Sequence, residues 1–160
     1  MALFLSRSTH KVDKKGRVSV PAAFRSALGN DIGKGIGLSR PLAGQNAIEA
    51  TPMSQVEERM AQIDTMASDS LQYAAYAHLL MGAVRTVAID SDGRMILPED
   101  LLTEAGITDS AVFVGLGRTF QIWEQRALDA FTIEAQALVA QDKGGRLPSV
   151  ASLSKGGPEQ

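Results

Sequence analysis

Two segments of this chain share one order of turn, apolar run and helical spacing. The dipeptides Lys15-Gly16 and Asp92-Gly93 are turn signals, because glycine adopts the positive φ that a tight hairpin requires. A short apolar run follows each turn and predicts a strand. Apolar residues at helical spacing then follow in both segments: Phe24 and Leu28 in the first, and Leu101, Leu102 and Ala105 in the second. Each segment therefore predicts strand, turn, strand and short helix.

The two segments match at an offset of 77 residues. Five identities occur at this offset: Asp13 with Asp90, Gly16 with Gly93, Arg17 with Arg94, Pro21 with Pro98, and Gly29 with Gly106. Proline fits the first turn of a helix, where its missing N–H costs nothing, and glycine fits the position just after a helix. Further strands are predicted after each copy: Gly35–Leu38, Ala47–Ala50, Ala111–Leu116 and Phe120–Trp123. The chain is thus a duplicated unit.

Helical periodicity fills the stretch between the copies and the stretch after the second. Apolar residues recur at spacings of three and four from Val56 to Ala67 and again from Leu71 to Gly82, which predicts two helices. A last amphipathic helix is predicted from about Gln125 to Ala140. From Asp142 onward the chain is rich in Gly, Ser and Pro, which is typical of a flexible tail.

Composition narrows the possible functions. The 160 residues are 44% hydrophobic and 21% charged, which favours a folded domain over a disordered chain. No cysteine is present, which excludes disulfides and thiolate chemistry and suits the cytosol. The two histidines, His10 and His78, are far apart in sequence, so no metal site is expected. We find no nucleophile–base pair and no cofactor loop, and we expect neither an enzyme nor a cofactor or small-molecule substrate.

The net charge of −2 conceals an uneven distribution. Residues 1–40 hold eight basic and two acidic residues, a net charge of +6, and the remaining 120 residues hold eight basic and sixteen acidic ones, a net charge of −8. A basic segment of this kind favours a polyanionic partner. The charge therefore points to the first copy as the place where nucleic acid binds.

The doubled pattern Asp-x-x-Gly-Arg-x-x-x-Pro, with a helical insert between its copies, resembles the MraZ family of bacterial transcription regulators. The resemblance implies an α+β fold in which two interlocked swapped-hairpin repeats of the AbrB/SpoVT type form a small barrel with pseudo-twofold symmetry. The implied division is a first domain at 7–54, a helical insert at 55–83, a second domain at 84–127, and a C-terminal helix and tail at 128–160.

The resemblance also implies a function. It predicts a cytoplasmic, nucleoid-associated regulator that binds short direct repeats in double-stranded DNA, in the promoter of the division and cell-wall gene cluster that includes its own gene, usually to repress it. A ring of several copies and no membrane association are expected. AbrB-like hairpins also occur in antitoxins, so the alternative is an antitoxin-like or assembly module whose basic hairpin binds an acidic protein.

Arg17 has two interpretations. It is a DNA contact, since arginine is the best bidentate donor to a guanine edge, or it is a brace that pairs with Asp13 across the hairpin. We favour the DNA contact because Lys11, Lys14 and Lys15 surround it and exceed what one aspartate can neutralise.

Arg94 has acidic neighbours instead, Asp90 and Asp92, and we favour a structural role for it, with DNA contact as the alternative. Both Asp13 and Asp90 are interpreted as acceptors for turn N–H groups rather than as catalytic carboxylates. We therefore expect the first copy to read DNA and the second mainly to complete the barrel or the contact between copies of the ring.

Overall fold

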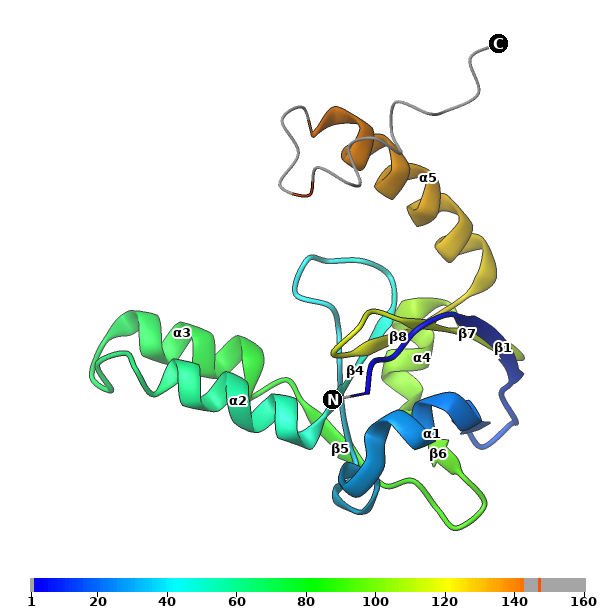
Figure 1. Cartoon of the computed structure of the whole chain (residues 1–160), viewed down its shortest axis with the longest axis horizontal. Helices are drawn as coiled ribbons and strands as arrows, with labels where there is room; N and C mark the ends of the chain where they lie inside the picture. The colour runs from blue at the N-terminus through cyan, green and yellow to red at the C-terminus, as the bar shows by residue number, and fades with distance from the viewer. Residues whose placement is uncertain (1, 143–146, 148–160) are drawn as a thin grey trace. The chain divides into compact units, whose positions relative to one another are not determined.

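The computed structural model describes residues 2–142 and 147, and its compact units are Met1–Glu124 and Gln125–Gln160. Figure 1 shows the elements, which confirm a mixed α+β fold. The first copy contains β1 (Arg7–Lys11), β2 (Arg17–Ser19), α1 (Ala22–Leu28), the 3-10 helix η1 (Gly29–Lys34), β3 (Ile36–Ser39) and β4 (Ile48–Pro52). The insert contains α2 (Met53–Ile63) and α3 (Leu71–Leu80). The second copy contains β5 (Arg85–Val87), β6 (Arg94–Ile96), α4 (Glu99–Ala105), β7 (Ser110–Gly115) and β8 (Phe120–Trp123).

Strands of the two copies pair with each other. Six strands form one antiparallel sheet in the order β1-β7-β8-β4-β3-β5, and β2 pairs with β6 in a separate two-stranded ribbon. The closed barrel that the resemblance implied is not formed by these pairings within residues 2–142 and 147. The reason is that β2 and β6 pair with each other, and a single bridge between Val12 and Val18 links β2 back toward β1.

The β2–β6 ribbon relates the two copies by an approximate twofold axis. Val18 lies opposite Met95, the residue 77 positions later in the chain. The N–H of Leu97 donates to the carbonyl of Gly16 at 2.8 Å, and the N–H of Val20 donates to that of Gly93 at 2.9 Å. These are the same contact made in both directions, so each copy supports the turn of the other.

The core draws on both copies. Val18, Val20, Met95 and Leu97 are at most 2% exposed, so the inner side of the ribbon is fully buried. Four phenylalanines pack beside it in edge-to-face, tilted and stacked pairs, with ring centroids 4.9 to 6.3 Å apart: Phe4, Phe24, Phe113 and Phe120. Burying such side chains contributes roughly 1.5–3 kcal/mol each, which holds the ribbon against the sheet.

The insert is a helical hairpin in which α2 and α3 lie side by side (Figure 1). Ser70 caps the start of α3, and its hydroxyl accepts the N–H of Tyr73 at 3.1 Å, so the chain breaks between the helices where the sequence predicted it. The unit Gln125–Gln160 contains α5 (Gln125–Gln141), which confirms the predicted last helix. The predicted flexible tail lies, apart from Asp142 and Leu147, outside the described residues. In the described part of the chain, no helix has the length and apolar character needed to span a membrane.

Candidate nucleic-acid interface

The side chain of Asp13 stabilises the turn of the first hairpin. Its Oδ1 accepts the backbone N–H groups of Lys15 and Arg17, both at 2.9 Å. The backbone N–H of Asp13 donates to the carbonyl of Arg17 at 3.0 Å, and Gly16 completes the turn at a φ of +81°. A Cβ on Gly16 would lie 2.8 Å from the carbonyl oxygen of Leu97, so only glycine fits here.

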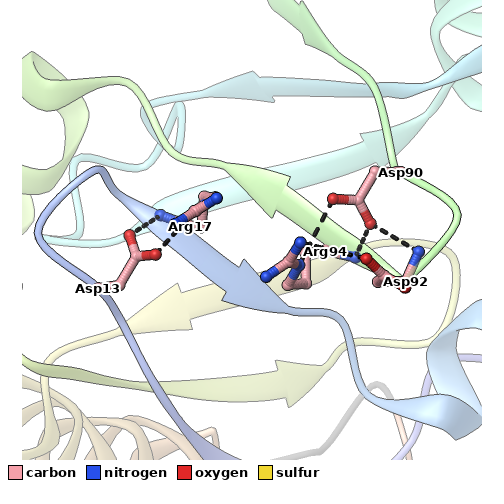
Figure 2. Close-up of polar contacts among 5 residues, drawn as sticks. All are labelled: Asp13, Arg17, Asp90, Asp92 and Arg94. Carbon is pink, nitrogen blue, oxygen red and sulfur yellow. Dashed lines mark hydrogen bonds and ion pairs between the residues drawn. The ribbon is translucent and has the colours of Figure 1, made fainter.

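Arg17 pairs with Asp13 across this hairpin (Figure 2). Its Nε donates to Asp13 Oδ2 at 2.7 Å, while the Arg17 side chain remains 38% exposed. The backbone N–H of Arg17, and then its guanidinium, hold the pKa of Asp13 below its ordinary value. Arg17 therefore forms the brace that was its alternative interpretation, yet it stays accessible to a ligand.

The second hairpin has the same turn but a different charge environment. Asp90 Oδ1 accepts the N–H groups of Asp92 and Arg94 at 2.9 and 3.0 Å, and the N–H of Arg94 contributes most to lowering the pKa of Asp90. Arg94 lies between two carboxylates: its Nε is 3.5 Å from Asp90 Oδ2, and its Nη2 is 3.2 Å from Asp92 Oδ2 (Figure 2). The second arginine is thus more fully neutralised than the first.

Both arginines lie on the outer face of the β2–β6 ribbon. Arg17 is opposite Ile96 and Arg94 is opposite Ser19, while Val18 and Met95 point into the core. A shallow cleft of about 450 Å³ beside them is lined by Lys11, Val12, Asp13, Arg17, Ser19, Arg94 and Asp109. The structure therefore brings three predicted cations, Lys11, Arg17 and Arg94, to one surface.

The other predicted residues have distinct places. Lys14 and Lys15 are exposed at the tip of the first hairpin and do not line the cleft. Pro21 and Pro98 precede α1 and α4 with φ of −52° and −57°, as expected at helix starts. Gly93, at a φ of +76°, forms the turn that matches Gly16. Sequence reasoning did not identify Ser19 and Asp109, which carry no motif and line the cleft only because the chain folds around it.

Comparison with known proteins shows to which family the chain belongs. The chain is 36% identical to the transcriptional regulator MraZ of Rickettsia akari (strain Hartford) over 143 residues, 89% of this chain and 95% of that protein. It is 40% identical to the transcriptional regulator MraZ of Pelagibacter ubique (strain HTCC1062) over 84% of this chain and 86% of that one. The family model described as "MraZ protein, putative antitoxin-like" matches residues 79–147. The chain belongs to the MraZ family.

In this MraZ-family chain a third arginine, Arg25, lies near the hairpins, although no sequence motif indicated it. Arg25, on α1 of the first copy, lies against the turn of the second, because a Cβ on Gly93 would be 2.8 Å from its guanidinium carbon. Its Nε donates to the carbonyl of Val20 at 3.2 Å. The residue that lies against Gly16 is the apolar Leu102, 77 positions after Arg25. The repeat alignment pairs these two residues, but no sequence signal shows that each helix packs on the turn of the other copy.

Proposed function

We propose that this chain is a sequence-specific DNA-binding transcription regulator that contacts double-stranded DNA with the outer face of the β2–β6 ribbon and with the tip of the first hairpin. The observation that carries this proposal is the convergence of Lys11, Arg17 and Arg94 on one cleft, with Lys14 and Lys15 exposed beside it. The relatives named transcriptional regulator MraZ support it.

The ribbon has an architecture that suits DNA binding. The major groove of B-DNA admits a two-stranded β-ribbon, and β2 and β6 form such a ribbon with one face buried and one face free. In the proposed complex, Arg17 contacts a guanine edge or a phosphate, since only its Nε is committed to Asp13. Lys11, Lys14 and Lys15 contact phosphates, which position a protein on the duplex without reading sequence.

Arg94 has the lesser role in this proposal. Asp90 and Asp92 both lie within ion-pair distance of its guanidinium, so a DNA contact would have to compete with two carboxylates. Arg94 mainly orders the second hairpin, which supports the first through the contacts of Gly16 and Gly93. The expected division of labour between the copies is therefore part of the proposal.

One hairpin offers few phosphate contacts, so a single site binds weakly and with strong salt dependence. A ring of several chains on several direct repeats would gain affinity through effective concentration. We therefore include in the proposal a ring-shaped homo-oligomer that acts in the cytoplasm at the nucleoid. Its targets are direct repeats in the promoter of the division and cell-wall cluster, which it represses together with its own gene.

Footprinting tests this function. The purified chain is titrated onto the DNA upstream of its own gene at low salt, with light scattering to record the oligomeric state. We expect protection of short, evenly spaced repeats. If no region is protected at low salt, the proposal is wrong, and binding to an acidic protein becomes the better account of the basic hairpin.

A further inference from the structure

Strand β1 extends the positive surface of the first copy beyond the hairpin. The side chains of Arg7, Thr9 and Lys11 are exposed, and those of Ser8 and His10 between them are partly buried. Because successive side chains in a strand point to opposite faces, Arg7 and Lys11 lie on the same face, about 14 Å apart at a rise of roughly 3.4 Å per residue. Lys11 also lines the cleft that holds Arg17 and Arg94, so the two cations continue that surface.

Neither cation is neutralised inside the described part of the chain. Carboxylates of the described residues pair with other cations, among them Arg17, Lys34, Arg40, Arg85 and Arg94. The residues opposite Arg7 and Lys11 on β7 are the uncharged Val114 and Ser110. Both charges of β1 are therefore available to a polyanion.

The second copy has no equivalent of these two charges. At the repeat offset of 77, Arg7 corresponds to Val84 and Lys11 to Ala88. The arginine on the equivalent strand, Arg85, is bound through both terminal nitrogens to Asp100. The approximate twofold axis thus relates the two arginines of the ribbon but does not relate the two β1 cations to cations of the second copy. The cation beside the second turn is Arg25, whose Nε donates to the carbonyl of Val20.

This difference adds to the one between the hairpin tips, where Lys14 and Lys15 of the first copy correspond to Ser91 and Asp92 of the second. We propose that Arg7 and Lys11 form a cationic arm that contacts phosphates beside the ribbon and, together with the lysines of the first tip, fixes the direction of the chain on the duplex. Their separation equals the axial length of about four base pairs. The inference rests on the proposed function, and it accounts for direct repeats, on which every bound chain has the same direction.

The first test counts phosphate contacts. Binding of the double variant Arg7→Ala/Lys11→Ala to duplex DNA from upstream of its own gene is measured against salt concentration. Loss of two contacts lowers the slope of log K against log salt by about 1.8. The control, Lys34→Ala/Arg40→Ala, removes the same net charge from two cations that are paired with Asp31 and Glu104, and it should change the slope by less than about 0.5. Equal changes in the two double variants would overturn the proposal, since net charge would then explain both.

The second test determines the direction in which the chain lies on the duplex. The chain has no cysteine, so Ser91→Cys at the exposed tip of the second hairpin provides a single attachment point for a DNA-cleaving iron chelate. We expect cleavage on one flank of each repeat, and added cleavage on the other flank once Arg7→Ala/Lys11→Ala is introduced. Cleavage confined to one flank in that variant too would overturn the proposal. Failure of the unsubstituted chain to bind the duplex would instead contradict the proposed function, so the two failures are distinguishable.

Discussion

The two hairpins have the same turn but opposite charge around it. The first hairpin contains Asp13 and Arg17, and the second contains Asp90 and Arg94. In each, the aspartate Oδ1 accepts two backbone N–H groups, and a glycine at positive φ completes the turn. The positions between aspartate and glycine differ, with two lysines in the first hairpin and a serine and an aspartate in the second. The aspartate, glycine and arginine thus build the hairpin, whereas in the proposed function the tip residues determine whether it attracts DNA.

The largest expected difference between the copies is in the free energy of unfolding that is lost when each turn glycine is replaced. Gly16→Ala places a Cβ 2.8 Å from the carbonyl oxygen of Leu97, which cannot move freely, whereas Gly93→Ala meets the guanidinium of Arg25, which can. Positive φ costs an L-residue roughly 1–2 kcal/mol at either site. We expect Gly16→Ala to lower the free energy of unfolding by about 3 kcal/mol and Gly93→Ala by about 1–2 kcal/mol. Urea unfolding measures both, and equal losses would show that the turns are equivalent.

Exchanging the tip residues should transfer DNA attraction from one copy to the other. Ser91→Lys/Asp92→Lys gives the second tip the charges of the first and removes one carboxylate from Arg94. We expect the slope of log K against log salt to steepen by about 1.8, as for two added phosphate contacts. The mirror variant, Lys14→Ser/Lys15→Asp, should lower it by about as much. An unchanged slope in the first variant would mean that the second tip does not approach DNA.

The smallest effect concerns acid stability. The pKa of Asp13 and that of Asp90 are both lowered in the folded chain. Their stabilisation is therefore fully present above the ordinary carboxyl pKa of about 3.9 and is lost as the pH falls through the lower, folded value. The free energy of unfolding should depend less on pH below about pH 4 in both Asp13→Asn and Asp90→Asn. The change should be larger for Asp13→Asn, because of the two carboxylates only Asp13 accepts a short bond from an arginine Nε. Urea unfolding between about pH 3 and 5 measures this, and a larger effect of Asp90→Asn would contradict it.

Much of this molecule was predictable because its signals are local. Tight turns require glycine, helix starts tolerate proline, and apolar spacing distinguishes strand from helix, so the duplicated turn–strand–helix unit and the helix Gln125–Gln141 follow from the sequence. The pairing of strands was not predictable in the same way. Nothing in the sequence shows that β2 bonds to β6, which leaves the six-stranded sheet open at β1 and β5.

The candidate site shows the same limit. The basic residues around Arg17 are contiguous in sequence, so charge counting located them. Arg94 appeared remote, 77 residues away, yet the ribbon places it on the same face as Arg17. Arg25 was overlooked for a similar reason, since its contact with Gly93 exists only because α1 packs on the other copy. Contacts between the copies depend on the fold, and local patterns do not encode them.

The central claim is that the two arginines are equivalent in position but not in function. Arg17 has one carboxylate partner and Arg94 has two. Replacing Arg94 alone would leave two carboxylates facing DNA. The double variant Arg94→Ala/Asp92→Ala leaves one, as Arg17→Ala does, and is therefore measured in addition to the single variant Arg94→Ala. Circular dichroism and urea unfolding confirm that each variant is folded before binding is compared.

The decisive measurement is the affinity of Arg17→Ala and of Arg94→Ala/Asp92→Ala for the same promoter duplex at one salt concentration. Loss of a bidentate arginine contact is worth about 1–3 kcal/mol, so we expect Arg17→Ala to weaken binding by up to roughly 100-fold. The Arg94 variant should weaken it less than about fivefold, since its guanidinium is already neutralised. An equal loss of affinity in two well-folded variants would contradict the claim that the first copy reads DNA and the second supports it.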